Sequence, residues 1–572
     1  MKSLKISAAV AMVLGAASAG ASTAPSTFND ILFTAGATAT DRTMLEVFLD
    51  STSGRGICAN FVDASGNITD ASGNATTADV ADVFVTSSTF DVTAPGNYAL
   101  RCTTESVTKG SVTLSAGQHV EFRKYSGGSE TGIEPVYTGT ATYHVSGIVQ
   151  TIYYADPTSG ACTLGGTVAP DTTNTRIGYR YYVNCAKFTP NGNGTDASGN
   201  LYAPQGGIAD VNAGLFGYTT GASTVTESPA IVQAFTVAVN TKFYKALQHL
   251  QGLDALTDAS GNLICVGTDA SGNTGMPIIA DQQAKCMPSL QIAAVRSLLA
   301  GGFADASKFY RTDASGNATQ IAAPTSTTFT VCSRGKTSGT RASIEATMFG
   351  QRCSPVNPNV VMGSQTTSKD ASGNACNDIG CAFSTSLIAS AGLGKASFFH
   401  GAGTGDVENC LKAVDASGNY GIGIMSSDRV PNDGSKPFRY IKIDDATPTV
   451  ESLIAGTWNY STENVVLDQG SSSPAASGSG YLNPAAPTNN NGIMWSIFKA
   501  LAIDPTFVPK THYAWAYGHG GIAVRPQTGV APATTDTQPS RAVAAMVRGG
   551  ATVGVNDCTA ATNASAAYPI KN

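Results

Sequence analysis

Apolar and polar residues alternate along this chain in patterns that predict strands and helices in turn. Residues 112–125 (VTLSAGQHVEFRKY) alternate with a period of two, which is typical of a strand buried on one face. Residues 231–240 (IVQAFTVAVN) are almost continuously apolar and predict a fully buried strand. Residues 290–301 carry apolar side chains at helical spacing and end at Gly301. Strands that alternate with helices favour an α/β architecture.

Further strands are predicted on either side of these segments. Residues 30–40 form a short strand that runs into a turn, and residues 327–333 form a strand that a helix follows from about Arg341. Within residues 136–190, the stretches 137–154 and 176–188 read as hairpin strands. This part of the chain is therefore expected to be rich in β-structure.

The first residues have the pattern of an export signal. Two lysines precede an apolar run, and the small residues that follow fit a signal-peptidase site at Ala19 or Ala21. We therefore expect residues 1–21 to be a signal peptide and the mature chain to be periplasmic or secreted. No later apolar run is long enough to predict a membrane span.

Charge and cysteine content narrow the function classes. Only 13% of residues are charged and the net charge is −6, so a nucleic-acid partner is not expected. The twelve cysteines are an even number without the clustered spacing of a zinc site, which in an exported chain predicts disulfides. Pairing neighbours along the chain gives Cys162–Cys185, Cys265–Cys286, Cys332–Cys353 and Cys376–Cys381.

The pentapeptide DASGN occurs eight times at irregular intervals, beginning at residues 63, 70, 196, 258, 269, 313, 370 and 415. Calcium sites need more carboxylates than one copy supplies, and a solenoid needs a fixed period. Asp at the first position and Gly at the fourth suit a type I turn. We therefore interpret the repeat as a surface turn that does not itself carry the function.

The segment with the clearest chemistry lies between the strand that ends near Cys332 and the following helix. Its loop holds four hydroxyl side chains and two cations, Arg334 and Lys336. Free N–H groups at a helix N-terminus, with an arginine beside them, form a site for a tetrahedral oxyanion. A simple N-cap needs only one such hydroxyl. A P-loop is excluded because Thr330 stands where its first glycine is required.

Catalytic patterns are weak by comparison. No GxSxG sequence is present, and the six histidines are scattered. We therefore expect a protein that is not an enzyme and that needs neither a cofactor nor a metal ion.

Six segments, in order, resemble the periplasmic phosphate-binding proteins of ABC importers. Arg334–Thr340 resembles the family's R-x-x-GSGT segment, residues 34–39 its GAGATF loop and residues 128–132 its GSSGG turn. The other three are residues 231–240, 289–307 and 400–428, which resemble the family's crossing strand, a helix and a GaIGY stretch.

The resemblance implies the two-lobed type 2 periplasmic-binding-protein α/β fold. Lobe 1 is expected at 22–240 with a β-rich insertion at 136–190, lobe 2 at 241–424, and a return to lobe 1 with a C-terminal extension at 425–572. The ligand implied is phosphate or a related oxyanion, and an ABC permease is a possible partner. The implied ligand contacts are Thr38, Ser129, Arg334, Ser338, Gly339 and Thr340.

The chain also departs from the family pattern. Where the family has an aspartate that accepts a proton from phosphate, the matching position is Leu215, and Asp210 matches an earlier, structural aspartate. A second family acid is replaced by Lys336, whereas Glu130 could restore one acceptor. Loss of acceptors weakens selectivity for phosphate over sulfate. The alternative interpretation is a secreted or surface structural protein on the same fold without a transport ligand.

Overall fold

The computed structural model describes part of the chain. The described residues are 30–51, 56–59, 81–92, 95–145, 148–157, 162–170, 176–188, 204–218, 225–265, 282–302, 311–312, 318–319, 329–349, 380–385, 396–426, 429, 431, 434–448, 452, 457–458, 460–468, 490–502 and 522–524.

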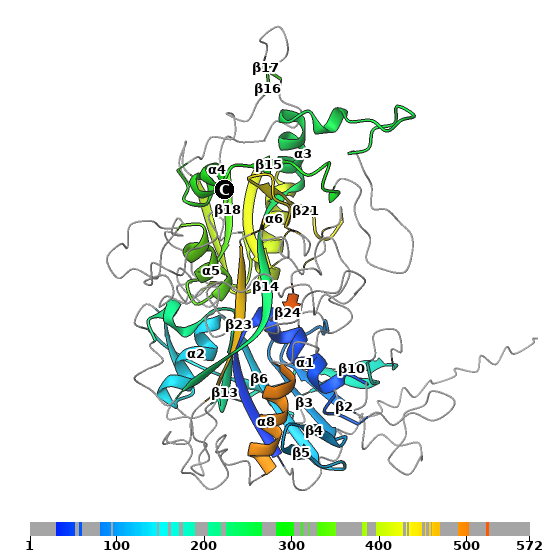
Figure 1. The fold of residues 1–572 in the computed structure, drawn as a ribbon, viewed down its shortest axis with the longest axis vertical. Helices are drawn as coiled ribbons and strands as arrows, with labels where there is room; N and C mark the ends of the chain where they lie inside the picture. Colours follow the sequence, from blue (N-terminus) through cyan, green and yellow to red (C-terminus); the bar gives the residue numbers. More distant parts are fainter. Residues whose placement is uncertain are drawn as a thin grey trace, which may run out of the picture.

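A large mixed sheet runs through the molecule (Figure 1). Its strands, in spatial order, are β10 (Thr163–Val168), β11 (Tyr179–Val183), β2 (Ala81–Val85), β3 (Tyr98–Thr103), β6 (His119–Gly127), β1 (Asp30–Ala37), β13 (Gly206–Ala209), β23 (Ser461–Asp468), β14 (Thr226–Asn240), β20 (Tyr420–Ser426), β18 (Phe329–Arg334) and β19 (Ser397–Gly401). Two more strands, β21 (Phe438–Tyr440) and β24 (Ile522–Val524), pair with β14.

The remaining strands form two-stranded pairs. These are β9 (Tyr154–Ala155) with β12 (Lys187–Phe188), β15 (Ser289–Leu290) with β22 (Lys442–Ile443), β16 (Arg311–Thr312) with β17 (Ala318–Thr319), β4 (Val107–Lys109) with β5 (Val112–Leu114), and β7 (Thr142–Val145) with β8 (Ile148–Thr151).

Helices cover the sheet (Figure 1). The α-helices are α1 (Asp41–Leu49), α2 (Ser129–Thr138), α3 (Thr241–Leu250), α4 (Ile292–Leu299), α5 (Gly339–Thr347), α6 (Thr404–Ala416) and α8 (Asn490–Ala502), and the short 3-10 helices are η1 (Thr38–Thr40), η2 (Ala213–Phe216) and η3 (Leu253–Ala255). This arrangement confirms the predicted mixed α/β class.

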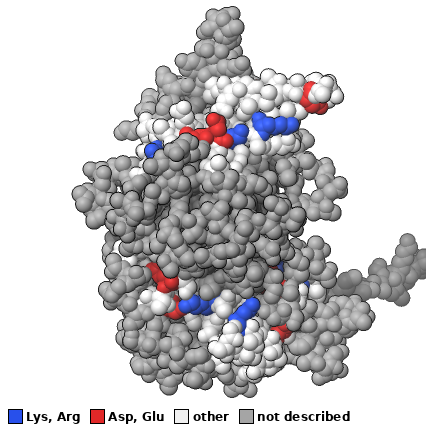
Figure 2. Space-filling model, in the orientation of Figure 1, with Lys and Arg blue, Asp and Glu red and all other residues white. Residues whose placement is uncertain are grey.

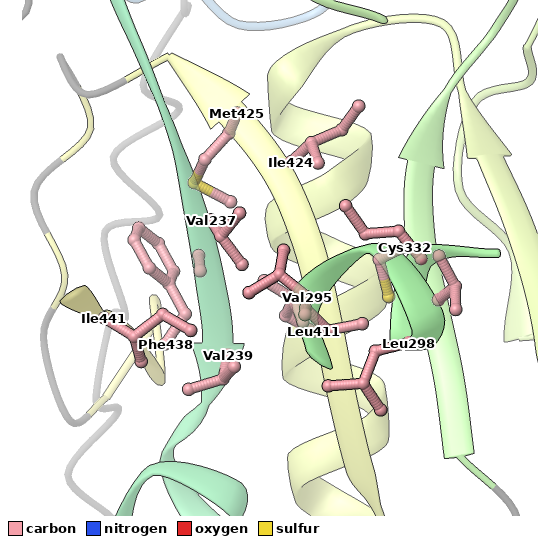
Figure 3. Packing of buried hydrophobic residues seen from close by; sticks show 14 of the residues in the cluster. Val237, Val239, Val295, Leu298, Cys332, Leu411, Ile424, Met425, Phe438 and Ile441 are labelled. Carbon is pink, nitrogen blue, oxygen red and sulfur yellow. The ribbon is translucent and has the colours of Figure 1, made fainter. Parts of the chain in front are cut away.

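Two large hydrophobic clusters lie at opposite ends of the long strands β14 and β23. The first, which we call the N-terminal cluster, joins β1, β2, β3 and β6 to α1 and α8, and it includes Phe48, Phe122 and Trp495. The second, the central cluster, joins the last part of β14 to β18, β20, α3, α4 and α6. Figure 3 shows side chains of this cluster, among them Val237 of β14, Leu411 of α6 and Ile424 of β20. Most of the described core thus lies in these two clusters, which β14 and β23 connect.

Close packing between β1 and β13 depends on a glycine. Gly36 has a φ of +137°, which side chains rarely adopt, and a Cβ at this position would lie 1.8 Å from the carbonyl oxygen of Ile208. This approach brings the carboxyl ends of β1, β6 and β13, which are parallel, to the same edge of the sheet.

Most predicted elements are found, with one clear correction. The expected strands at 30–40, 231–240 and 327–333 correspond to β1, β14 and β18, and the helix before Gly301 is α4. Residues 112–125, however, are two strands, β5 and β6, because Gly117 turns the chain between them with a φ of +79°. Strand β6 is also covered on both faces and not only on one.

The disulfides confirm two predicted pairs and overturn a third. Cys162–Cys185 and Cys265–Cys286 are bonded, and so is Cys58–Cys102, which the sequence did not predict. Cys332 is bonded to Cys410 of α6 and not to Cys353. Packing decides this, because both cysteines are fully buried in the central cluster where α6 lies over β18.

For the last predicted disulfide, Cys376–Cys381, only one member is described. Cys381 is disulfide-bonded, and Cys376 lies outside the described residues.

Two DASGN copies are described in full, and they play different structural roles. At 258–262 the copy is an exposed turn in which the Asp258 carboxylate accepts from the backbone N–H groups of Ser260 and Asn262 at 2.8 and 2.9 Å. At 415–419 the copy ends α6, and Gly418 has a φ of +74°. The Asp258 carboxylate is thus used by its own turn, as the turn interpretation requires.

The visible surface carries no single-sign patch among the described residues, since Figure 2 shows Lys and Arg next to Asp and Glu on that face. Within the described part of the chain, no helix is both long and apolar enough to cross a membrane.

Candidate functional site

The candidate site is built where strands end and helices begin. At or within three residues of the ends of strands β1, β6, β13, β18 and β19 lie Thr38, Ser129, Asp210, Arg334 and Thr404, respectively. The carboxyl ends of parallel strands with helix N-termini beyond them are the usual ligand position in open α/β sheets.

Arg334, the last residue of β18, is buried at the centre of this arrangement with 1% of its surface exposed. Its Nη1 donates to the Thr404 hydroxyl at 3.2 Å. Its Nη2 donates to the Ala402 carbonyl at 2.9 Å and to the Thr38 hydroxyl at 3.4 Å. Its Nε is buried and has no hydrogen-bond partner among the described residues. The guanidinium therefore retains one donor for a further acceptor.

The N-terminus of α5 follows four residues later. Ser338 is the N-cap, and its hydroxyl accepts from the backbone N–H of Arg341 at 3.4 Å. Thr340, in the first turn, is fully buried, and its Oγ1 has no hydrogen-bond partner in the described structure. Both the helix end and the free hydroxyl favour a negatively charged group here.

Ser129 and Asp210 close the site from the other side. Ser129 begins α2 and is fully buried, and its Oγ accepts from the backbone N–H of Asp210 at 2.8 Å. A Cβ on Gly339 would lie 2.1 Å from the Ser129 Oγ and 2.9 Å from the Asp210 Oδ2. Only a glycine lets α5 approach this closely, so the contact brings both residues to the N-terminus of α5.

A buried ion pair supports the floor of the site. Lys124 of β6 is fully buried, and its Nζ pairs with the Asp41 carboxylate at the start of α1. The same Nζ donates to the Ala37 carbonyl at 3.3 Å, and Asp41 also accepts from the Ser126 hydroxyl at 2.5 Å. The pair thus ties the end of β1, and with it Thr38, to β6.

Burial dominates the electrostatics of these groups. It raises the pKa of Asp210 to about 6, although the nearby Arg334 guanidinium and the Ser129 hydroxyl oppose the shift. Burial lowers the pKa of Arg334, against the attraction of Asp210 and Asp406. Burial also raises the pKa of Asp41, against its pairing with Lys124. The Asp210 carboxyl can therefore change protonation near neutral pH.

The structure brings the six predicted ligand contacts together. Thr38 is hydrogen-bonded to Arg334, and Ser129 lies against Gly339. Ser338 and Thr340 flank that glycine in the first turn of α5. Their assignment as ligand contacts stays a prediction.

Four residues bear on the contrast with the phosphate-binding family, and the structure places them in different surroundings: Leu215, Lys336, Glu130 and Asp210. Leu215 packs against Ala342 and Ala346 of α5, and Lys336 is exposed. Glu130 is half-buried; burial raises the phenol pKa of Tyr218, and the nearby Glu134 and Glu130 carboxylates add to the shift. Asp210, which the sequence assigned a structural role, is the carboxylate that borders the site.

Comparisons with known proteins add little beyond this geometry. No family model matches the chain, and no curated protein matches it. Several solved structures match it with low scores, among them the following three. A protein from Clostridium perfringens assigned as a phosphate ABC transporter substrate-binding protein, solved with bound phosphate, has a TM-score of 0.29 and 10% identity over 77% of this chain and 86% of its own.

The other two similar structures give lower scores. An ABC-type phosphate transport receptor from Vibrio cholerae has a TM-score of 0.21 and 12% identity over 47% of this chain and 69% of its own. PstS from Borrelia burgdorferi has a TM-score of 0.21 and 8% identity over 46% and 67%. Similarities of this size carry no functional argument, so the function proposed below rests on the residues of the site.

Sequence reasoning missed four residues of the site: Asp41, Lys124, Thr404 and Asn464. Asn464 lies on β23, and its Nδ2 donates to the Asp210 Oδ1 at 3.2 Å. Asp41 and Thr404 stand at the start of helices that follow strands, which was the signal available for them. Lys124 and Asn464 lie within strands and show no local signal.

Among the described residues, no group of three or more His, Cys, Asp or Glu side chains is placed to hold a metal ion.

Proposed function

We propose that this protein binds phosphate or a closely related oxyanion at the N-terminus of α5. The observation that carries the proposal is the pair of buried donors without partners, Arg334 Nε and Thr340 Oγ1, in one site. Leaving a buried polar group unpaired costs about 1–3 kcal/mol, so two together favour a ligand that satisfies them. A tetrahedral oxyanion has acceptors for both, and α5 adds free backbone N–H groups.

Asp210 supports a protonated oxyanion over a fully ionised one. An ionised carboxylate accepts hydrogen bonds only, so it pairs with the P–OH of monohydrogen phosphate and repels sulfate. Because the carboxylate lies beside Ser129 and Gly339, it is placed next to the same helix end as the two unpaired donors. The site therefore restores the acceptor that the Leu215 position lacks.

The ligand would lie between two lobes of the type 2 periplasmic-binding-protein fold. The N-terminal cluster supports a first lobe and the central cluster a second, with β14 and β23 as the crossing strands. We place the return to the first lobe at β23 and not at residue 425, because Tyr440 and Trp458 are buried in the central cluster. Residues 136–190 add strands β7 to β12 to the first lobe as a β-rich insertion.

The cellular role we propose is capture of the anion outside the cytoplasm for an ABC-type importer. The signal pattern of residues 1–21 and the disulfides support an exported protein, since disulfides persist in oxidising compartments. The permease and the periplasmic or secreted location both belong to this proposal.

Calorimetric titration of desalted protein with phosphate, arsenate and sulfate tests the proposal. We expect phosphate and arsenate to bind and sulfate to bind far more weakly at pH 7.5. Replacing Thr340 by Val should weaken phosphate binding at least about tenfold, because a hydrogen bond to a charged group contributes about 1.5–3 kcal/mol. The same change should leave stability unchanged or higher, since it removes a buried unpaired hydroxyl.

Thr347→Val is the matched control, because Thr347 lies on the same helix and its hydroxyl is already satisfied by the Ser343 carbonyl at 2.8 Å. It should not alter phosphate binding. Absence of heat with all three anions would contradict the proposal and favour the structural-protein alternative.

A further inference from the structure

Asn464 is a buried polar residue that is not among the six predicted ligand contacts. It is 1% exposed and lies on β23, one of the two strands that connect the hydrophobic clusters. In the register of β13 with β23, Ala209 pairs with Val465, so Asn464 follows next to Asp210. The pairing of β23 with β14 shifts at this point, between Val465 and Glu463. The ladder between β14 and β23 is thus irregular at Asn464, because β14 has an extra residue opposite it.

The amide of Asn464 is only half satisfied. Its Nδ2 donates to Asp210 Oδ1 at 3.2 Å, whereas its own Oδ1 is buried and without a hydrogen-bond partner among the described residues. A buried amide oxygen left unpaired is costly, and its presence calls for a reason. We infer that the cost is offset by the Nδ2 group of the same amide, which donates to Asp210 and holds its carboxyl in place.

The contact distinguishes the two oxygens of the Asp210 carboxyl. An amide NH2 group can only donate, so Asp210 Oδ1 must remain an acceptor. The other oxygen, Oδ2, faces the first turn of α5. A proton received from a ligand would therefore be held on Oδ2.

We propose that Asn464 is a specificity-determining positioning residue, which keeps Asp210 ionised and oriented so that the site discriminates protonated oxyanions from sulfate. The inference rests on the proposed function and adds a residue to it. Asn464 does not touch the anion in this arrangement; it acts through Asp210.

Other charged groups around Asp210 act on the same carboxyl. Arg334 at the end of β18 and Lys124 of β6 favour its ionised form, and Asp41 at the start of α1 opposes it. The Ser129 hydroxyl of α2 also favours ionisation. From β23, Asn464 donates a hydrogen bond to this carboxyl. Because Asn464 is neutral, it can be replaced without changing the formal charge of the site.

Sulfate is the probe that isolates this effect, because it stays fully ionised between pH 5 and pH 8, whereas phosphate itself titrates. Wild-type protein should bind sulfate at low pH, where Asp210 is protonated and can donate, and should lose it as Asp210 ionises. Asn464→Leu removes the donor to the ionised form, so the midpoint of the sulfate profile should move to higher pH. The phosphate-to-sulfate affinity ratio at pH 7 should fall about tenfold, the equivalent of one hydrogen bond to a charged group.

Asn240→Leu is the matched control. Asn240 is equally buried, and its Nδ2 donates to the Asp415 carboxylate at 3.1 Å, at the far end of α6 from the site. It should lower thermal stability without moving the sulfate profile. Asn464→Ser, whose side chain is too short to reach Asp210, should reproduce the shift of Asn464→Leu and serves if the leucine variant does not fold.

The outcomes separate this inference from the proposed function. A sulfate profile and an affinity ratio that match the wild type in both Asn464 variants would overturn the role of Asn464 while phosphate binding stands. Binding of neither anion by the wild-type protein would overturn both. A shift in the Asn464 variants but not in Asn240→Leu is the result we expect.

Discussion

Arg334 and Arg341 are two arginines of equal burial, each 1% exposed, with different hydrogen-bond partners. Arg341 pairs with Glu345 at 2.7 Å and donates to the Arg334 carbonyl at 3.2 Å. Arg334 keeps an unpaired Nε. Arg334→Met should therefore reduce phosphate affinity at least about tenfold, since the charge-assisted hydrogen bond from Nε is lost together with the positive charge. Arg341→Met should lower stability but should not reduce phosphate affinity as Arg334→Met does. An equal loss of phosphate affinity in both variants, measured by calorimetry, would refute the assignment of Arg334 as a ligand contact.

Asp210 makes stability depend on pH in a defined direction. Burial raises its pKa from 3.8 to about 6, so the folded protein holds the proton more tightly than the unfolded chain. The resulting stabilisation is fully present below about pH 4 and is lost as the pH rises to about 6, by about 3 kcal/mol in all, of which about 2 kcal/mol falls between pH 4.5 and pH 7.5. Asp210→Asn should remove this part of the pH dependence. Urea unfolding at pH 4.5 and pH 7.5 checks it, and an unchanged difference between the two pH values would contradict the pKa assignment.

At the scale of elements, the Cys332–Cys410 disulfide joins β18 to α6 across 78 residues of sequence. Strand β18 ends at Arg334, and α6 begins at Thr404, which accepts a hydrogen bond from it. Replacing both cysteines by Ala should lower stability by about 4 kcal/mol in the loop-entropy model and weaken phosphate binding. Removing Cys162–Cys185, at the edge of the sheet, should leave binding unchanged. The idea fails if the two double variants bind phosphate equally.

Elements with a strong local signal could be predicted from the sequence, and those that depend on distant packing could not. Strand β14 and helix α4 are continuous in their patterns, so they are found where expected. Helix α8 was not predicted. Its apolar side chains, including Trp495 and Phe498, are buried by packing against strands distant in the sequence, β1 and β5, so no local pattern indicated the helix.

The same limit applies to the site. The loop from Arg334 to Thr340 is local, so its residue types were enough to indicate an anion site. Cys332 is nearer to Cys353 in sequence, but α6 brings Cys410 to it in space. Asp210 and Asn464 are 254 residues apart, and no pattern within one segment links them.

At the scale of the whole molecule, Gly339 decides how closely the two proposed lobes can meet. A methyl group there would lie 2.1 Å from the Ser129 Oγ, across the contact between α5 and α2. Gly339→Ala should keep the two proposed lobes apart. We expect a larger radius of gyration than that of the wild type in X-ray scattering with phosphate present, and at least about a tenfold loss of phosphate affinity. In the first turn of α6, Gly405→Ala adds a methyl with nothing within 4 Å and should change neither quantity. Tight phosphate binding by Gly339→Ala would contradict this role.

The connection of the two clusters by β14 and β23 has a consequence for the order of folding. The N-terminal cluster draws its residues from both ends of the described chain, from Leu32 to Ala502, whereas the central cluster is complete by Trp458. During synthesis, the part made first therefore cannot finish its core until nearly the whole chain has been translated. If the chain is exported as we propose, this topology would keep it unfolded until late in synthesis, because its first strands complete their core only when α8 packs against them.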